Sequence, residues 1–183
     1  LLLDAFGIVA DARPDTVLVM VGDGPERARL EAEVERRGWT GRVIFTGTLD
    51  RRRVIDAYSG SDVLFFASVT ETQGLVTLEA MAAGIPVAAV DAPGTKDMVR
   101  HGREGLLADE SASSLARQAL ALLGNRDLRT RLAHGAKQRA QEFSATRQAE
   151  RMIEAYQTLL AQEGVPGSQE GEEPVRWKQE YSS

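Results

Sequence analysis

Glu71 and Glu79 stand on either side of Gly74, in the stretch of the chain with the clearest capacity for chemistry. Helix-forming residues run from Leu75 to Ala83, and Gly84 follows at a position where helices commonly end. The first turn of a helix carries amide N–H groups without an intrahelical partner and a partial positive charge. The sequence therefore predicts an anion site at a helix N-terminus, with one carboxylate in the loop before it and a second carboxylate within the helix.

Helical spacing places Glu79 on an apolar face of this predicted helix. Leu75, Leu78, Glu79 and Ala82 follow the i, i+3, i+4, i+7 pattern, and we expect this face to meet the core. A buried carboxylate is costly unless other groups bond to it. A solvated glutamate or an ordinary turn would explain each feature alone, but their combination favours a binding site.

Strands and helices alternate along the chain and would position these residues. Apolar runs predict strands at 16–21, 43–46, 62–68, 86–90 and 105–108. Helical patterns occupy 1–12, 26–38, 51–60 and 75–83, and further helices follow from residue 111 to 162. This alternation predicts an α/β fold, a Rossmann-like, doubly wound parallel sheet of about five strands with helices on both faces. Glu71 follows the strand at 62–68, at the edge where such sheets bind ligands.

The stretch from Glu71 to Pro86 resembles the acidic motif of retaining glycosyltransferases of the GT-B fold, the family-4 or group 1 type. The two acids, the glycine, the helix and the Gly-Ile-Pro-Val strand entry agree with that motif together. The resemblance covers roughly residues 1–162 and implies the carboxyl-terminal half of such an enzyme, which binds the nucleotide-sugar donor. Residues 163–183, rich in Gly, Pro, Ser and Glu, are expected to form a flexible polar tail.

The resemblance implies a role for each acid. Glu71 would be the catalytic residue, an acidic side chain that contacts the hydroxyls of the donor sugar, and Gln73 would help to orient that sugar. Glu79 would accept hydrogen bonds from the ribose hydroxyls, which would offset its burial. Where the family usually has a glutamate after the next strand, this chain has Asp97, preceded by Gly94.

Backbone groups complete the implied donor site. The amides of Gly74, Leu75 and Val76 would cap the diphosphate, with the helix dipole stabilising charge that grows as the nucleotide leaves. Thr46 and Gly47, in the loop after the second predicted strand, would contact the base. Lys96 could meet a phosphate, although a surface lysine is an equally good interpretation.

The reaction implied by the family is transfer of a hexose from a UDP- or GDP-linked donor, with retention of configuration and without a metal or cofactor. The acceptor could be a lipid or polysaccharide precursor. The acceptor-binding amino-terminal half would be a separate part of the same protein. The family's Arg and Lys pair that grips the diphosphate, and the strand before it, would lie upstream of Leu1. We therefore expect this fragment to bind nucleotide weakly, if at all, and to lack turnover.

Other functions remain open at this point. A non-catalytic nucleotide-sugar-binding domain is one alternative, although the presence of both Glu71 and Glu79 argues against it. A UDP-sugar epimerase on the GT-B scaffold is another. A nicotinamide-dependent dehydrogenase is disfavoured because Arg27 stands where the dinucleotide fingerprint would need its third glycine.

Composition excludes several classes of partner and site. The net charge of −5 gives no electrostatic reason to expect a nucleic-acid partner. The absence of Cys removes disulfides and thiolate sites, and His101 and His134 alone make a histidine-rich metal site improbable. No apolar run approaches the roughly 20 residues of a spanning helix. We expect a cytoplasmic protein, with peripheral contact at the inner face of the membrane left open through the missing half.

Overall fold

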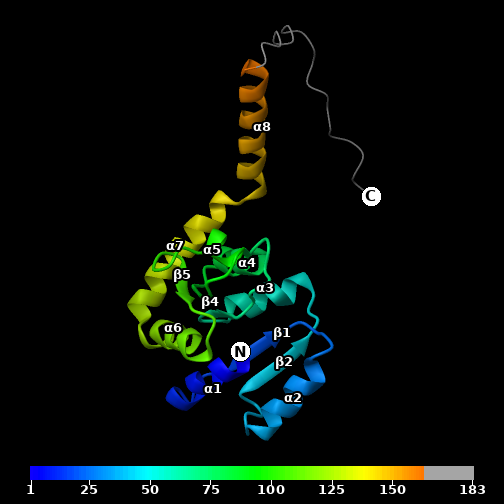
Figure 1. Ribbon diagram of the computed structural model, residues 1–183, viewed down its shortest axis with the longest axis vertical. Helices are drawn as coiled ribbons and strands as arrows, with labels where there is room; N and C mark the ends of the chain where they lie inside the picture. Colours follow the sequence, from blue (N-terminus) through cyan, green and yellow to red (C-terminus); the bar gives the residue numbers. More distant parts are fainter. Residues whose placement is uncertain (163–183) are drawn as a thin grey trace. The chain divides into compact units, whose positions relative to one another are not determined.

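The computed structural model describes residues 1–162 as alternating helices and strands, and the predicted polar tail at 163–183 lies outside the described residues. Figure 1 shows these helices and strands with their labels. The strands are β1 (Leu18–Val21), β2 (Val43–Gly47), β3 (Leu64–Phe66), β4 (Val87–Val90) and β5 (Gly105–Ala108). The helices are α1 (Leu2–Ala12), α2 (Arg27–Arg36), α3 (Arg51–Ser59), α4 (Leu75–Ala82), α5 (Thr95–Met98), α6 (Ala112–Gly124), α7 (Arg126–Glu142) and α8 (Ala145–Gln162).

The strands pair in parallel, as predicted, but they form two sheets. β1 pairs with β2, with Leu18 opposite Val43. The other sheet has the order β3–β4–β5, with Val87 of β4 opposite Leu64 on one side and Gly105 on the other. Within the described residues no ladder joins β1 to β3. The α/β class and the parallel strands are confirmed, whereas the expected continuous sheet is interrupted between β1 and β3.

β4 is the central strand of the larger sheet and is buried on both faces. Ala88 and Val90 pack in a cluster with side chains of α1 and α6. Val87 and Ala89 point the other way, into a cluster with side chains of α4 and α7. This alternation follows from the two-residue period of a strand. It explains why the segment reads as a continuous apolar run, because both of its faces meet helices.

α1 packs against both sheets. Leu3, Phe6 and Ala10 belong to a cluster with residues of β1 and β2. Ala5 and Val9 belong to the cluster that contains β4 and β5. The helix also packs along α6. α1 therefore contacts the strands on both sides of the interruption between β1 and β3.

Residues 1–144 form one compact unit, and a second unit begins at Ala145 with α8. Along α8 the large apolar side chains are exposed; they are Met152, Ile153, Tyr156, Leu159 and Leu160. Their spacing of three and four residues makes α8 amphipathic.

Candidate donor-binding site

The carboxylate of Glu71 is held at the N-terminal end of α4. Its Oε1 atom accepts hydrogen bonds of 2.9 Å from the backbone N–H groups of Gln73 and of Gly74. These two bonds stabilise the charged form and hold the pKa of the Glu71 carboxyl below its usual value. The loop thereby places a fixed negative charge, still partly exposed, directly before the helix.

Gly74 and Gly94 let the loops after β3 and β4 pack against each other. Gly74 has a φ of 66°, and a Cβ atom there would lie only 2.7 Å from the carbonyl O of Gly94. Gly94 has a φ of 76°, and a Cβ atom on it would collide with the carbonyl O of Glu71. Only glycine combines this backbone conformation with such close approach. The two loops therefore pack together tightly, and this packing fixes the backbone at Glu71.

The first turn of α4 is open to a ligand. Gly74 is the N-cap and, having no side chain, cannot cap the turn. The amides of Leu75 and Val76 lie in that turn and have no partner within the helix. The side chains of Leu75 and Val76 are exposed. The helix C-terminus is closed as predicted, because Gly84, with a φ of 81°, donates to the carbonyl O of Met81 and Ile85 donates to that of Ala80.

The expected burial of Glu79 is wrong. Thr77, Ala80 and Met81 form the buried face of α4, whereas Leu75, Glu79 and Ala82 are exposed. Almost every residue from 75 to 83 is apolar or small, so periodicity alone cannot fix which face turns inward. Packing of α4 against α7 and β4 decides it instead. The Glu79 carboxylate is therefore accessible to a ligand, not hidden beneath one.

Tyr58 of α3 is a partner of Glu79 that the sequence did not reveal. Its hydroxyl lies 3.4 Å from Glu79 Oε2, to which it donates, and 3.4 Å from the carbonyl O of Val76. Burial, followed by the negative charge of Glu79, raises the pKa of Tyr58 to about 12. The two residues are far apart in sequence, and the helical pattern of 51–60 gives no sign of a contact between them.

Thr46 and Gly47 lie at the end of β2, on the smaller sheet. The Thr46 hydroxyl donates to the carbonyl O of Gly47 over 2.9 Å, and Gly47 accepts a 3.0 Å bond from Gly22 N. Beside them Arg27 contacts the Asp23 carboxylate at 3.3 Å. The Thr46 hydroxyl is thus already bonded to its own neighbour in sequence.

The loop after β4 ends in the short helix α5, for which the sequence shows no helical pattern. The Asp97 carboxylate accepts a 3.3 Å bond from the N–H of Gly94 and so caps α5. Lys96 is exposed. Asp97 therefore has a structural partner at this position.

The predicted site residues fall into three places. Val76 and Glu79, together with Tyr58, line a cavity of about 820 Å³. Glu71, Gln73, Gly74 and Leu75 form the loop and helix mouth and do not line it. Thr46 and Gly47 lie at the end of β2. All three places follow strand carboxyl ends or the helix that continues from one, which is the ligand-binding edge of this class of sheet.

Within residues 1–162 no helix is both long and apolar enough to cross a bilayer. In the same residues no three His, Asp or Glu side chains gather in a way that could hold a metal ion.

Residues 1–139 match the model of a family described as "Glycosyl transferases group 1". Among curated proteins, the chain is 35% identical over 163 residues to a 2-deoxystreptamine glucosyltransferase of Streptomyces kanamyceticus. That alignment covers 88% of this chain and 42% of the relative. The chain thus spans less than half the length of that relative.

Solved structures share the fold. Anabaena Alr3699/HepE in complex with UDP matches with a TM-score of 0.74 and 25% identity, over 85% of this chain and 44% of that one. The C-terminal domain of a group 1 family glycosyl transferase, LpcC of Francisella tularensis, matches with a TM-score of 0.67 and 25% identity. The latter match covers 76% of this chain and 77% of that domain.

Proposed function

Because the chain belongs to the group 1 glycosyltransferases, we propose that it is the donor-binding domain of a retaining hexosyltransferase. The donor would be a UDP- or GDP-linked sugar. The open first turn of α4, with the Glu71 carboxylate fixed beside it, carries this proposal. The structural relative solved in complex with UDP supports a nucleotide ligand.

In the proposed complex the diphosphate lies at the N-terminus of α4. The amides of Leu75 and Val76 would donate to its oxygens, and the helix dipole would favour its charge. The same groups would stabilise the negative charge that grows on the nucleotide as the glycosidic bond breaks. The aligned amides need no reorganisation at that moment, because Gly74 and Gly94 have already fixed the loop.

Glu71 and Glu79 would recognise hydroxyl groups at two ends of the donor. Glu71 would accept from the sugar hydroxyls through Oε2, since Oε1 is already bonded to two amides. Glu79, exposed on α4, would accept from the ribose hydroxyls. Gln73 would contact the sugar, and the backbone at Thr46 and Gly47 would contact the base.

Calorimetric titration of the 183-residue chain with UDP, GDP and NAD tests this proposal. We expect UDP or GDP to bind with low affinity and NAD to give no heat. Glu79→Gln should weaken nucleotide binding by about 1–3 kcal/mol, because a charge-assisted bond is lost. Glu110→Gln changes an exposed acid outside the site and serves as the matched control. Equal binding by both variants would remove Glu79 from the site.

A further inference from the structure

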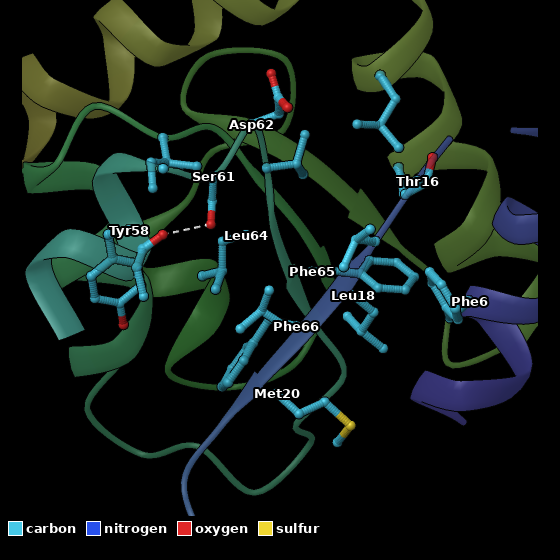
Figure 2. A pocket seen from close by; sticks show the side chains of 18 of the residues that line it. Phe6, Thr16, Leu18, Met20, Tyr58, Ser61, Asp62, Leu64, Phe65 and Phe66 are labelled. Atoms are coloured by element: carbon cyan, nitrogen blue, oxygen red, sulfur yellow. Dashed lines mark hydrogen bonds between the residues drawn. The ribbon is translucent and has the colours of Figure 1, made fainter. Parts of the chain in front are cut away.

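Tyr58 joins α3 to the exposed carboxylate of α4. Its hydroxyl lies 3.4 Å from Glu79 Oε2 and 3.4 Å from the carbonyl O of Val76. All three residues line the cavity of about 820 Å³. Figure 2 shows Tyr58 at one side of this cavity, across it from Phe6 of α1. A phenol hydroxyl is therefore placed directly beside the acid that would contact the ribose.

Tyr58 is held more firmly than Glu79. It is partly buried, whereas Glu79 is exposed. Its helix is capped at the beginning, where the Asp50 carboxylate accepts from the N–H of Arg53 over 2.9 Å. A tyrosine side chain has two rotatable bonds before its rigid ring, and a glutamate loses more rotamer freedom when it is fixed. The Tyr58 hydroxyl is therefore the fixed partner of the pair, and the Glu79 carboxylate is the group that needs to be held.

Within residues 1–162, Tyr58 is the one hydrogen-bond partner of the Glu79 carboxylate. The bond goes to Oε2 and leaves Oε1 available to a ligand. Glu71 shows a similar division, since its Oε1 atom accepts from the amides of Gln73 and Gly74. Each of the two acids is thus held by the protein through one carboxylate oxygen.

We propose that Tyr58 is a positioning residue for recognition of the ribose. By bonding Oε2, it orients the Glu79 carboxylate so that Oε1 accepts from a ribose hydroxyl. A carboxylate that is already oriented loses less rotamer freedom when the ligand binds, so its bond contributes more to the affinity. The inference rests on the proposed donor site, in which Glu79 contacts the ribose.

Two features suit Tyr58 to this role. Burial, followed by the negative charge of Glu79, raises the pKa of Tyr58 to about 12, so the hydroxyl keeps its proton at neutral pH. It is then a donor beside a carboxylate, which in its ionised form only accepts. Its second contact, with the carbonyl O of Val76, ties it to the first turn of α4, where the diphosphate would lie. Tyr58 is therefore placed relative to both parts of the proposed site.

The expected effect is confined to ligands that carry the ribose hydroxyls. The 2′,3′-dideoxy forms of UDP and GDP keep the base and the diphosphate but offer Glu79 no hydroxyl donor. A residue that only stabilised the fold would affect the ribose and dideoxyribose ligands equally. The ratio of the two affinities therefore separates the contact at Glu79 from the other contributions to binding.

NMR titrations of the 183-residue chain measure this ratio even at low affinity. We expect the chain to prefer UDP or GDP over its dideoxy form by about tenfold, because the dideoxy form lacks a bond to a charged group. Tyr58→Phe keeps the ring, and should lower this preference by about threefold while leaving the dideoxy affinity unchanged. Tyr156→Phe, the same change at an exposed position of α8, is the matched control and should leave the preference as it was.

A double variant tests whether Tyr58 acts through Glu79. Glu79→Ala should remove most of the preference for the ribose forms. In the Glu79→Ala background, Tyr58→Phe should have no further effect on the preference, because no carboxylate is left to orient. An independent contact between Tyr58 and the ribose would instead give a further loss.

Three results would overturn the inference. If Glu79→Ala removes the preference but Tyr58→Phe preserves it, Tyr58 has no positioning role, while the proposed donor site is retained. If Tyr58→Phe weakens both ligand forms equally, its hydroxyl supports only the fold. If the unaltered chain has no preference for the ribose forms, or if Glu79→Ala retains one, the proposed role of Glu79 fails and this inference fails with it.

Discussion

At the residue scale, the place of Glu71 in the loop before α4 and the turn at Gly74 could be predicted, because both depend on neighbours in sequence. The carboxylate bonds to amides two and three residues later, and the glycine supplies a positive φ directly before a helix. The contact of Glu79 with Tyr58 could not be predicted. It depends on which face of α4 turns inward and on how α3 is placed beside it, and both are decided by packing between distant segments.

The Tyr58 hydroxyl should lose its proton at a higher pH than an ordinary tyrosine does. Its pKa is raised from 10.0 to about 12, first by burial and then by Glu79, so the folded state favours the protonated form. This favours folding below about pH 10 and is lost as the pH rises from about 10 to about 12. Tyrosinate absorbance should show a late step that Tyr58→Phe removes and Tyr156→Phe leaves in place. Glu79→Gln should move that step part of the way toward pH 10, because burial persists; a late step that survives in Tyr58→Phe would refute the assignment.

Gly74→Ala should destabilise the chain. A left-handed backbone costs a non-glycine residue roughly 1–2 kcal/mol, and the new Cβ would also crowd the carbonyl O of Gly94. Gly102→Ala is the matched control, because Gly102 has a φ of 78° but nothing within 4 Å of its added Cβ. Urea unfolding should therefore show a larger loss for Gly74→Ala than for Gly102→Ala. Equal losses would mean that the interlocking of the two loops adds nothing.

At the element scale, the sequence located each strand because apolar runs with flanking Gly, Pro and Asp are strong local signals. The sequence did not predict α5, because four residues within a loop are too few to show the helical period. It also missed the interruption between β1 and β3, because pairing between strands depends on which strand occupies each place in the sheet. Nor did the sequence reveal the buried acid Glu104, which anchors the turn before β5.

The turn from Arg100 to Glu104 is held by an ion pair in which the carboxylate is buried and the guanidinium is partly exposed. Glu104 is 1% exposed and accepts from the Arg100 backbone N–H over 2.7 Å and from its guanidinium. Arg100→Ala would leave the buried carboxylate without its cation, which should cost about 3 kcal/mol. Arg103→Ala, at an exposed side chain in the same turn, should change the free energy of unfolding by no more than about 0.5 kcal/mol. Similar values for the two variants would show that the pair contributes little.

At the scale of the whole molecule, we expect this chain to bind the donor without transferring its sugar. The chain carries the proposed donor site on residues 1–144, yet it spans 42% of the length of its glucosyltransferase relative. Transfer requires an acceptor held against the sugar, and holding two reactants together supplies much of the rate enhancement of such reactions. We therefore expect the acceptor-binding part to lie elsewhere in the complete protein.

The chain alone should bind a nucleotide sugar without transferring it. Incubation with UDP- and GDP-sugars should yield no glycosylated acceptor, whereas the complete protein should turn over. In the complete protein, Glu71→Gln should lower kcat by at least about tenfold with a smaller change in KM, since a contact that strengthens in the transition state is lost. Glu110→Gln, away from the helix mouth, should leave both unchanged. Robust transfer by the 183-residue chain would show that its own loops suffice to hold an acceptor and would overturn this division of roles.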